Sequence, residues 1–231
     1  MGVALTGPLS GVVNRIAALS GFLGTIVIVM AGSLSDPARA GVYPAPTLDS
    51  DVVATLFARN SQRGRLGAQL MLLGAFLMLW FGSYLFARLR RAEGAPTWSS
   101  ALVLAGTVVL VTFLLVEAGF GYAASELSEW GTDTQPARMI SLWGWNSAVL
   151  LAPGSAAVLL GCTIAGLRDG AIPRGLAVAA GLGLVLLLLI AVLMGAPGLA
   201  ASIGGLWVAV ASLVLGLKRD AEGSIRRSRT S

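Results

Sequence analysis

The sequence predicts an all-α fold, a polytopic transmembrane bundle of six helices with a short outer amphipathic helix between the first two spans. The first observation behind this prediction is composition: 56% of the 231 residues are hydrophobic and 12% are charged, whereas soluble domains carry about 25% charged residues. The second is that apolar stretches of about 20 residues, enough to cross a bilayer, recur along the chain. These stretches are continuous rather than alternating, so they predict helices and not the strands of a barrel.

The first predicted span covers residues 16–33 and directly follows Arg15. A cleaved signal peptide is the alternative, because Ala38-Arg39-Ala40 has the small-x-small form of a cleavage site. That site lies well beyond the apolar stretch, with Pro37 in between. We therefore favour a retained helix.

Residues 34–65 form the longest polar segment, which we predict to be an extracytoplasmic loop containing a short helix. Asp49-Ser50-Asp51 is typical of a helix start, because short oxygen-bearing side chains accept hydrogen bonds from the first backbone N–H groups. Apolar residues follow at helical spacing, which predicts an amphipathic helix on the membrane surface. Three arginines close the segment, and headgroup anchoring is their simplest role: Arg59, Arg63 and Arg65.

Five further spans follow, and the chain ends in a basic tail at residues 218–231. Pro197 separates the last two spans, because proline cannot continue a preceding helix. The predicted spans are residues 66–87, 101–121, 140–167, 175–195 and 199–217.

The basic residues cluster near the ends of the spans, so the net charge of +5 indicates membrane orientation and not nucleic-acid binding. With both termini in the cytoplasm, eleven lysines and arginines lie inside and five outside. This bias predicts a multi-pass plasma-membrane protein with a cytoplasmic N-terminus and C-terminus.

Small residues recur four positions apart in the last three spans, for example Ala157, Gly161 and Ala165. Such stripes let helix backbones approach closely in lipid. Internal packing is the favoured interpretation, with contact to a protein partner or a second copy as the alternative. The lipid bilayer is the expected surrounding partner.

A resemblance follows from two inner turns and one segment. The turns are residues 89–96 (LRRAEGAP) and 167–174 (LRDGAIPR), and the segment is residues 53–65, which leads into the second span. From about residue 50 onward the chain resembles a group of actinobacterial multi-span membrane proteins of uncharacterised function. The resemblance implies a six-helix plasma-membrane protein, and it implies no activity, substrate or cofactor.

Glu117 is the one carboxylate inside an apolar stretch, about one helical turn from the outer end of its span. Asn146 begins the membrane part of the next span and is expected at the same depth. Together with Arg65 they form a candidate polar pocket. The alternative is a structural role, in which Glu117 lies at the outer membrane interface and is bonded to a neighbouring side chain. We slightly favour this role, because no second intramembrane acid or base completes a proton relay.

Pro153-Gly154 lies near the middle of its span and predicts a kink. Broken helices mark substrate sites in many transporters, although kinks without a transport role are commoner. Cys162, the one cysteine, is expected to be inert packing. The chain has no histidine and no cluster typical of metal ligands, so the sequence predicts no metal and no cofactor.

Three functions remain open. A structural or accessory membrane protein that contacts a partner or lipid is favoured. The alternative is a small-molecule or ion permease with an outward-facing pocket around Glu117 and Asn146. An enzyme comes third, because only a carboxylate mechanism at the membrane surface, using Glu117, Glu126, Glu129 or Asp133, is compatible with the sequence.

Overall fold

The computed structural model describes the backbone of residues 8–35, 55, 59–93, 98–130, 134–193 and 197–228. Side chains are described for residues 11–34, 55, 59–93, 98–127, 151–193 and 202–217. Within this part of the chain the regular structure is entirely α-helical. The all-α prediction is therefore confirmed.

Six long helices follow one another along the chain: α1 (Pro8–Ser35), α3 (Ser61–Glu93), α4 (Trp98–Trp130), α5 (Thr134–Arg168), α6 (Arg174–Leu193) and α7 (Pro197–Ser228). Five of them contain described segments that are long and apolar enough to cross a membrane. The described apolar segment of α7, Ser202–Leu217, is shorter than these five. The start of the predicted outer amphipathic helix, at residues 49–51, lies outside the described residues.

The helices run past the apolar stretches that predicted them. The span predicted at residues 66–87 is part of a helix from Ser61 to Glu93, and α4 continues beyond residue 121 to Trp130. Arginine and glutamate are good helix formers, so a helix need not end where its side chains become charged. The hydropathy pattern located the edges of the apolar band and not the ends of the helices.

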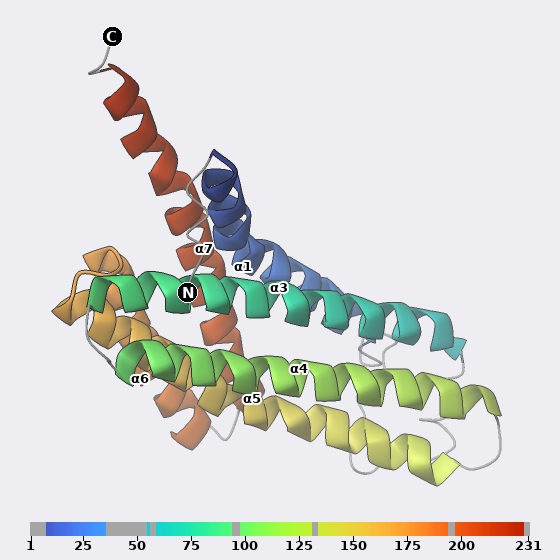
Figure 1. Cartoon of the computed structure of the whole chain (residues 1–231). Coiled ribbons are helices and arrows are strands. Elements are labelled where there is room, and N and C mark those ends of the chain that lie inside the picture. Colours follow the sequence, from blue (N-terminus) through green and yellow to red (C-terminus); the bar gives the residue numbers. More distant parts are fainter. Residues whose placement is uncertain are drawn as a thin grey trace, which may run out of the picture.

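Helices that follow one another in the sequence are antiparallel (Figure 1). Gly64 lies against Ser125 at one end of the α3–α4 pair, and Gly82 lies against Thr107 farther along. Helices α4 and α5 are also antiparallel, because Gly161 lies against Ser99 and Gly154 lies against Gly106. Helices that are consecutive in the sequence therefore pack side by side in an up-and-down bundle.

The first and last helices also meet. The Ser212 hydroxyl of α7 accepts a hydrogen bond from the backbone N–H of Phe22 at 2.9 Å and donates to the carbonyl of Ala18, both in α1. Leu19 packs on Gly216 close by. The early turns of α1 and the late described turns of α7 thus share one end of the bundle.

The α5–α6 turn is tight and is tied to α3. Gly170 has a φ of 65°, a conformation that side-chain-bearing residues rarely adopt. The carbonyl of Ala171 accepts a hydrogen bond from Arg88 Nε at 3.2 Å. This bond joins the turn to the last turns of α3.

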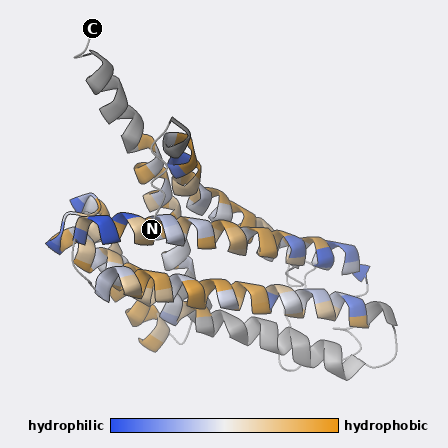
Figure 2. Cartoon of the chain, viewed as in Figure 1, coloured by the Kyte–Doolittle hydropathy of each residue, from blue (hydrophilic) through white to orange (hydrophobic). Residues whose placement is uncertain are grey.

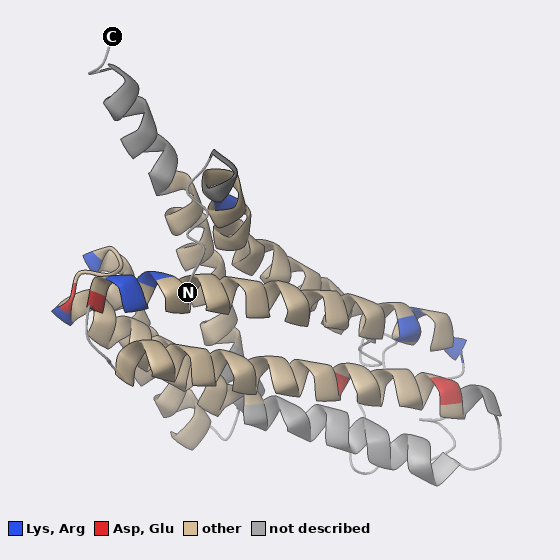
Figure 3. Ribbon diagram, in the orientation of Figure 1, with Lys and Arg blue, Asp and Glu red and all other residues tan. Residues whose placement is uncertain are grey.

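Charge is segregated along the bundle. Figure 2 shows hydrophilic residues at both ends of α3 and apolar residues between them. Residues 66–87 carry no charge, and 22 residues of helix span about 33 Å, close to the thickness of a bilayer's hydrocarbon core. Figure 3 shows arginines at both ends of this band. We call one end the basic end, defined by Arg88, Arg90, Arg91, Arg168 and Arg174.

Candidate functional site

Arg65 lies at the opposite end of α3 from the basic end, and its partner is Glu126. Arg65 Nε is 3.1 Å from Glu126 Oε1, and both side chains are about 30% exposed. This pair joins the beginning of α3 to the end of α4, where Gly64 and Ser125 bring the two backbones together. An exposed pair of this kind contributes only about 0–1 kcal/mol. The pair is therefore a consequence of how α3 and α4 pack and contributes little to holding them together.

Glu117 lies nine residues before Glu126 on α4, or about 13 Å along the helix axis. Its side chain is half-buried, and in the described part of the chain it makes no hydrogen bond or ion pair. The structure thus places Arg65 with Glu126 and does not bring it to Glu117. The sequence analysis did not predict this pairing; it considered Glu126 only as a carboxylate for a mechanism at the membrane surface.

Glu117 lies on the stripe of α4 that faces α5. Gly106 and Leu110 of this stripe contact Gly154 of α5, and Glu117 follows Leu110 after two helical turns on the same face. Because the pair is antiparallel, extending this register predicts that position 146 of α5 is level with Glu117. The side chain of Asn146 lies outside the described residues, so the polar pocket stays a prediction.

Pro153 and Gly154 lie where three helices cross. The backbone helix α5 continues through Pro153, which is exposed, whereas Gly154 is buried against Gly106 and Leu110 of α4. One residue on, Ser155 is 3% exposed and faces Gly204 of α7. Close backbone packing is the role that the structure shows for this segment. The predicted kink stays a prediction.

A small apolar cavity of about 100 Å³ lies beside this crossing. Side chains from five helices line it, and Ser155 supplies a hydroxyl among mainly aliphatic groups. Cys162, about two turns beyond Ser155 along α5, is fully buried. Among the described residues, no three histidine, cysteine or carboxylate side chains gather as a metal site.

A second cavity, which sequence reasoning missed, opens at the basic end between α1 and α3. Its volume is about 470 Å³, and its polar lining comes from Asn14, Ser83, Tyr84, Arg88 and Arg91. The spacing of Tyr84, Arg88 and Arg91 places them on one face of a helix. The sequence shows that spacing, but it does not show which residues of α1 lie opposite.

The fold and these sites define an all-α polytopic protein with helices suited to crossing a membrane. Comparison of the chain with protein-family models, with curated proteins and with solved structures finds no match. The resemblance to actinobacterial multi-span proteins therefore stays a prediction.

Proposed function

We propose that this chain is a structural or accessory protein of the plasma membrane, which holds a protein partner or lipid and does not itself carry a substrate across. The observation that supports this is the close glycine packing between successive helices. Gly64 and Gly82 hold α3 against α4, Gly106 and Gly161 hold α4 against α5, and Gly166 meets Ala177 of α6. The α3–α4 and α4–α5 pairs are thus each in close contact at two places, and the α5–α6 pair is in close contact near its turn.

Packing of this kind opposes the motions that transport requires. Alternating access moves one group of helices against another, and small residues that interdigitate must separate for that to happen. The cavity beside Pro153 has a volume of about 100 Å³ and a mainly aliphatic lining, so it offers a charged or polar substrate few partners. Both observations favour a structural role over transport.

A permease is the alternative, and one observation favours it. Glu117 faces α5, so its carboxylate is directed toward the helix pair and could bind a cation there. Asn146, predicted at the same level, would donate to that carboxylate or complete the site.

We expect Glu117→Gln to leave the fold intact, with an apparent melting temperature in detergent within about 2–4 °C of the unaltered protein. We also expect vesicles reconstituted with either protein to show no more K⁺, Na⁺ or H⁺ flux than protein-free vesicles. Ion-sensitive dyes in the vesicle lumen measure this. Flux that requires the unaltered protein and falls about tenfold or more in Glu117→Gln would establish the permease instead.

We infer that the basic end is cytoplasmic. The charge bias of the sequence supports this orientation. The contact between the early turns of α1 and the late turns of α7 at that end supports placing the two termini on the same side. Both termini would then lie inside.

Single cysteines at two exposed positions of α3 test the orientation. We expect a membrane-impermeant maleimide to label Arg63→Cys in intact cells, and to label Arg90→Cys only after the cells are made permeable. The natural Cys162 is fully buried, so the unaltered protein is the unlabelled control. The reverse labelling pattern would place the basic end outside.

A further inference from the structure

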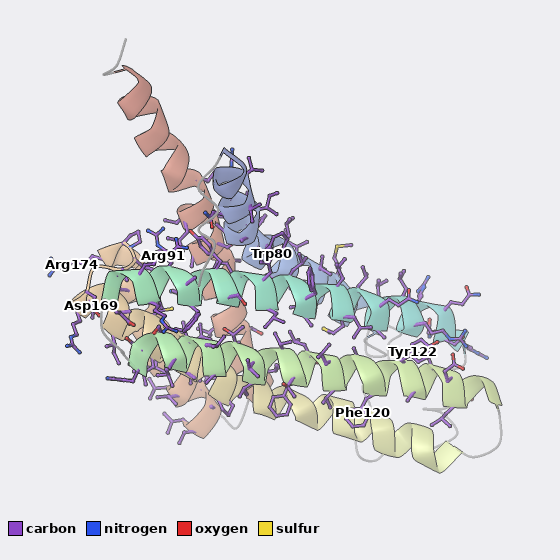
Figure 4. All side chains as sticks on the ribbon, viewed as in Figure 1. Trp80, Arg91, Phe120, Tyr122, Asp169 and Arg174 are labelled. Atoms are coloured by element: carbon purple, nitrogen blue, oxygen red, sulfur yellow. The ribbon has the colours of Figure 1, made fainter. Side chains whose placement is uncertain are left out.

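The cavity at the basic end combines an apolar region with a cationic one. Trp80 and Ala17 line it toward the apolar band, whereas Arg88 and Arg91 line it toward the end of the bundle. Figure 4 shows Trp80 and Arg91 on the side of α3 that faces α1. Residues 80 and 91 are separated by about 16 Å of helix. The cavity lining therefore changes from apolar to cationic over a distance comparable to the length of a small molecule with one apolar and one anionic end.

Within the part of the chain whose side chains are described, no carboxylate compensates the positive charge of the cationic region. None of the described residues that line the cavity is acidic, and neither Arg88 nor Arg91 has an ion-pair partner among them. Arg88 is partly buried, and its Nε donates to the carbonyl of Ala171 at 3.2 Å. That bond orients the guanidinium without neutralising it, because a backbone carbonyl carries no net charge.

Further hydrogen-bonding groups surround the two arginines. The Tyr84 hydroxyl is buried and has no hydrogen-bond partner in the described part of the chain. The Asn14 amide of α1 lines the cavity from the opposite wall. A buried hydroxyl without a partner is costly, so a ligand that accepts from it would stabilise the structure.

We propose that this cavity binds a phosphate group, with Arg88 and Arg91 as its cationic contacts and Tyr84 and Asn14 as neutral donors. Guanidinium groups match the geometry of phosphate oxygens. The apolar region around Trp80 fits the glycerol and first acyl carbons of an anionic phospholipid in the same leaflet. A soluble phosphate compound shares the chemistry of the headgroup, and the experiment separates the two sources.

The test titrates purified full-length protein in neutral detergent with phosphatidylglycerol, with phosphatidylcholine and with glycerol phosphate, and measures binding by native mass spectrometry. We expect phosphatidylglycerol to bind, and its affinity to fall about tenfold or more in Arg88→Gln/Arg91→Gln. The matched control is Arg90→Gln/Arg174→Gln, which removes the same charge from the same end. Neither control residue lines the cavity, and Arg90 lies over the Phe86 ring, so we expect affinity within about twofold.

Arg91→Gln alone guards against a folding defect, because Arg88 also holds the α5–α6 turn. It should weaken phosphatidylglycerol binding several-fold with an unchanged melting temperature. Binding of glycerol phosphate with the same dependence on Arg88 and Arg91 would support the phosphate site and identify its source as soluble. Equal weakening in both double variants, or binding of no phosphate compound, would overturn the proposal.

Discussion

Gly106→Leu is expected to destabilise the bundle by about 3 kcal/mol or more, a large part of the 5–15 kcal/mol that holds a typical domain folded. A β carbon added at Gly106 would lie 2.7 Å from the carbonyl oxygen of Gly154 and 2.9 Å from the β carbon of Ala157. The first of these neighbours is backbone, which cannot rotate away. Helices α4 and α5 would therefore have to separate along the crossing beside Pro153.

Gly119→Leu, on the same helix, is the matched control. Gly119 is exposed, and an added β carbon there meets no atom within 4 Å. Leucine is also the better helix former by up to about 1 kcal/mol, so this variant should be neutral or slightly more stable. Unfolding both variants in mixed micelles of increasing denaturant content measures the difference. Equal stability of the two variants would show that α4 and α5 are not in close contact at Gly106.

Trp207→Ala is expected to cost about 3 kcal/mol, the lower end of the range for deleting a buried aromatic ring, since lipid and not water surrounds the bundle. The ring is 6% exposed on α7, and its Nε1 donates to the carbonyl of Leu176 in α6 at 3.1 Å. The substitution removes both the packing and the bond between the last two helices. Denaturant unfolding in mixed micelles, with tryptophan fluorescence of the remaining rings, measures the cost.

Two companion variants separate the contributions at this position. Trp207→Phe keeps most of the ring volume and loses the N–H, so about 1 kcal/mol should be lost. Leu206→Ala alters the adjacent residue, which is 67% exposed, and should stay within about 0.5 kcal/mol of the unaltered protein. A Leu206→Ala loss as large as that of Trp207→Ala would contradict the burial of Trp207 between α6 and α7.

The sequence was sufficient for the class of fold, because continuous apolar stretches in a chain this poor in charge leave only helices that satisfy their own backbone. It was not sufficient for the pairing of Arg65. The choice between Glu117 and Glu126 depends on the register of α3 against α4, and that register is set by contacts such as Gly82 with Thr107. Nothing in a single sequence shows which glycine meets which partner.

The cavity at the basic end was missed for a related reason. The positive-inside bias explains why arginines such as Arg88 and Arg91 are at that end, but it does not show what they face. The cavity also requires Asn14, whose place on the opposite wall depends on how α1 crosses α3. Cross-helix geometry, and not local pattern, creates this site.

The two hydrogen bonds between the Ser212 hydroxyl and the backbone of Phe22 and Ala18 have a consequence for the order in which the helices assemble. These residues are 190 and 194 positions apart, whereas the other helix pairs with glycine contacts mostly follow one another directly in the chain. During synthesis, α1 can pack on α3 early, but the face of α1 that contacts Ser212 stays uncovered until α7 has left the ribosome. Helix α7 thus contacts α1, α5 and α6 only after the contacts among the preceding helices can already have formed.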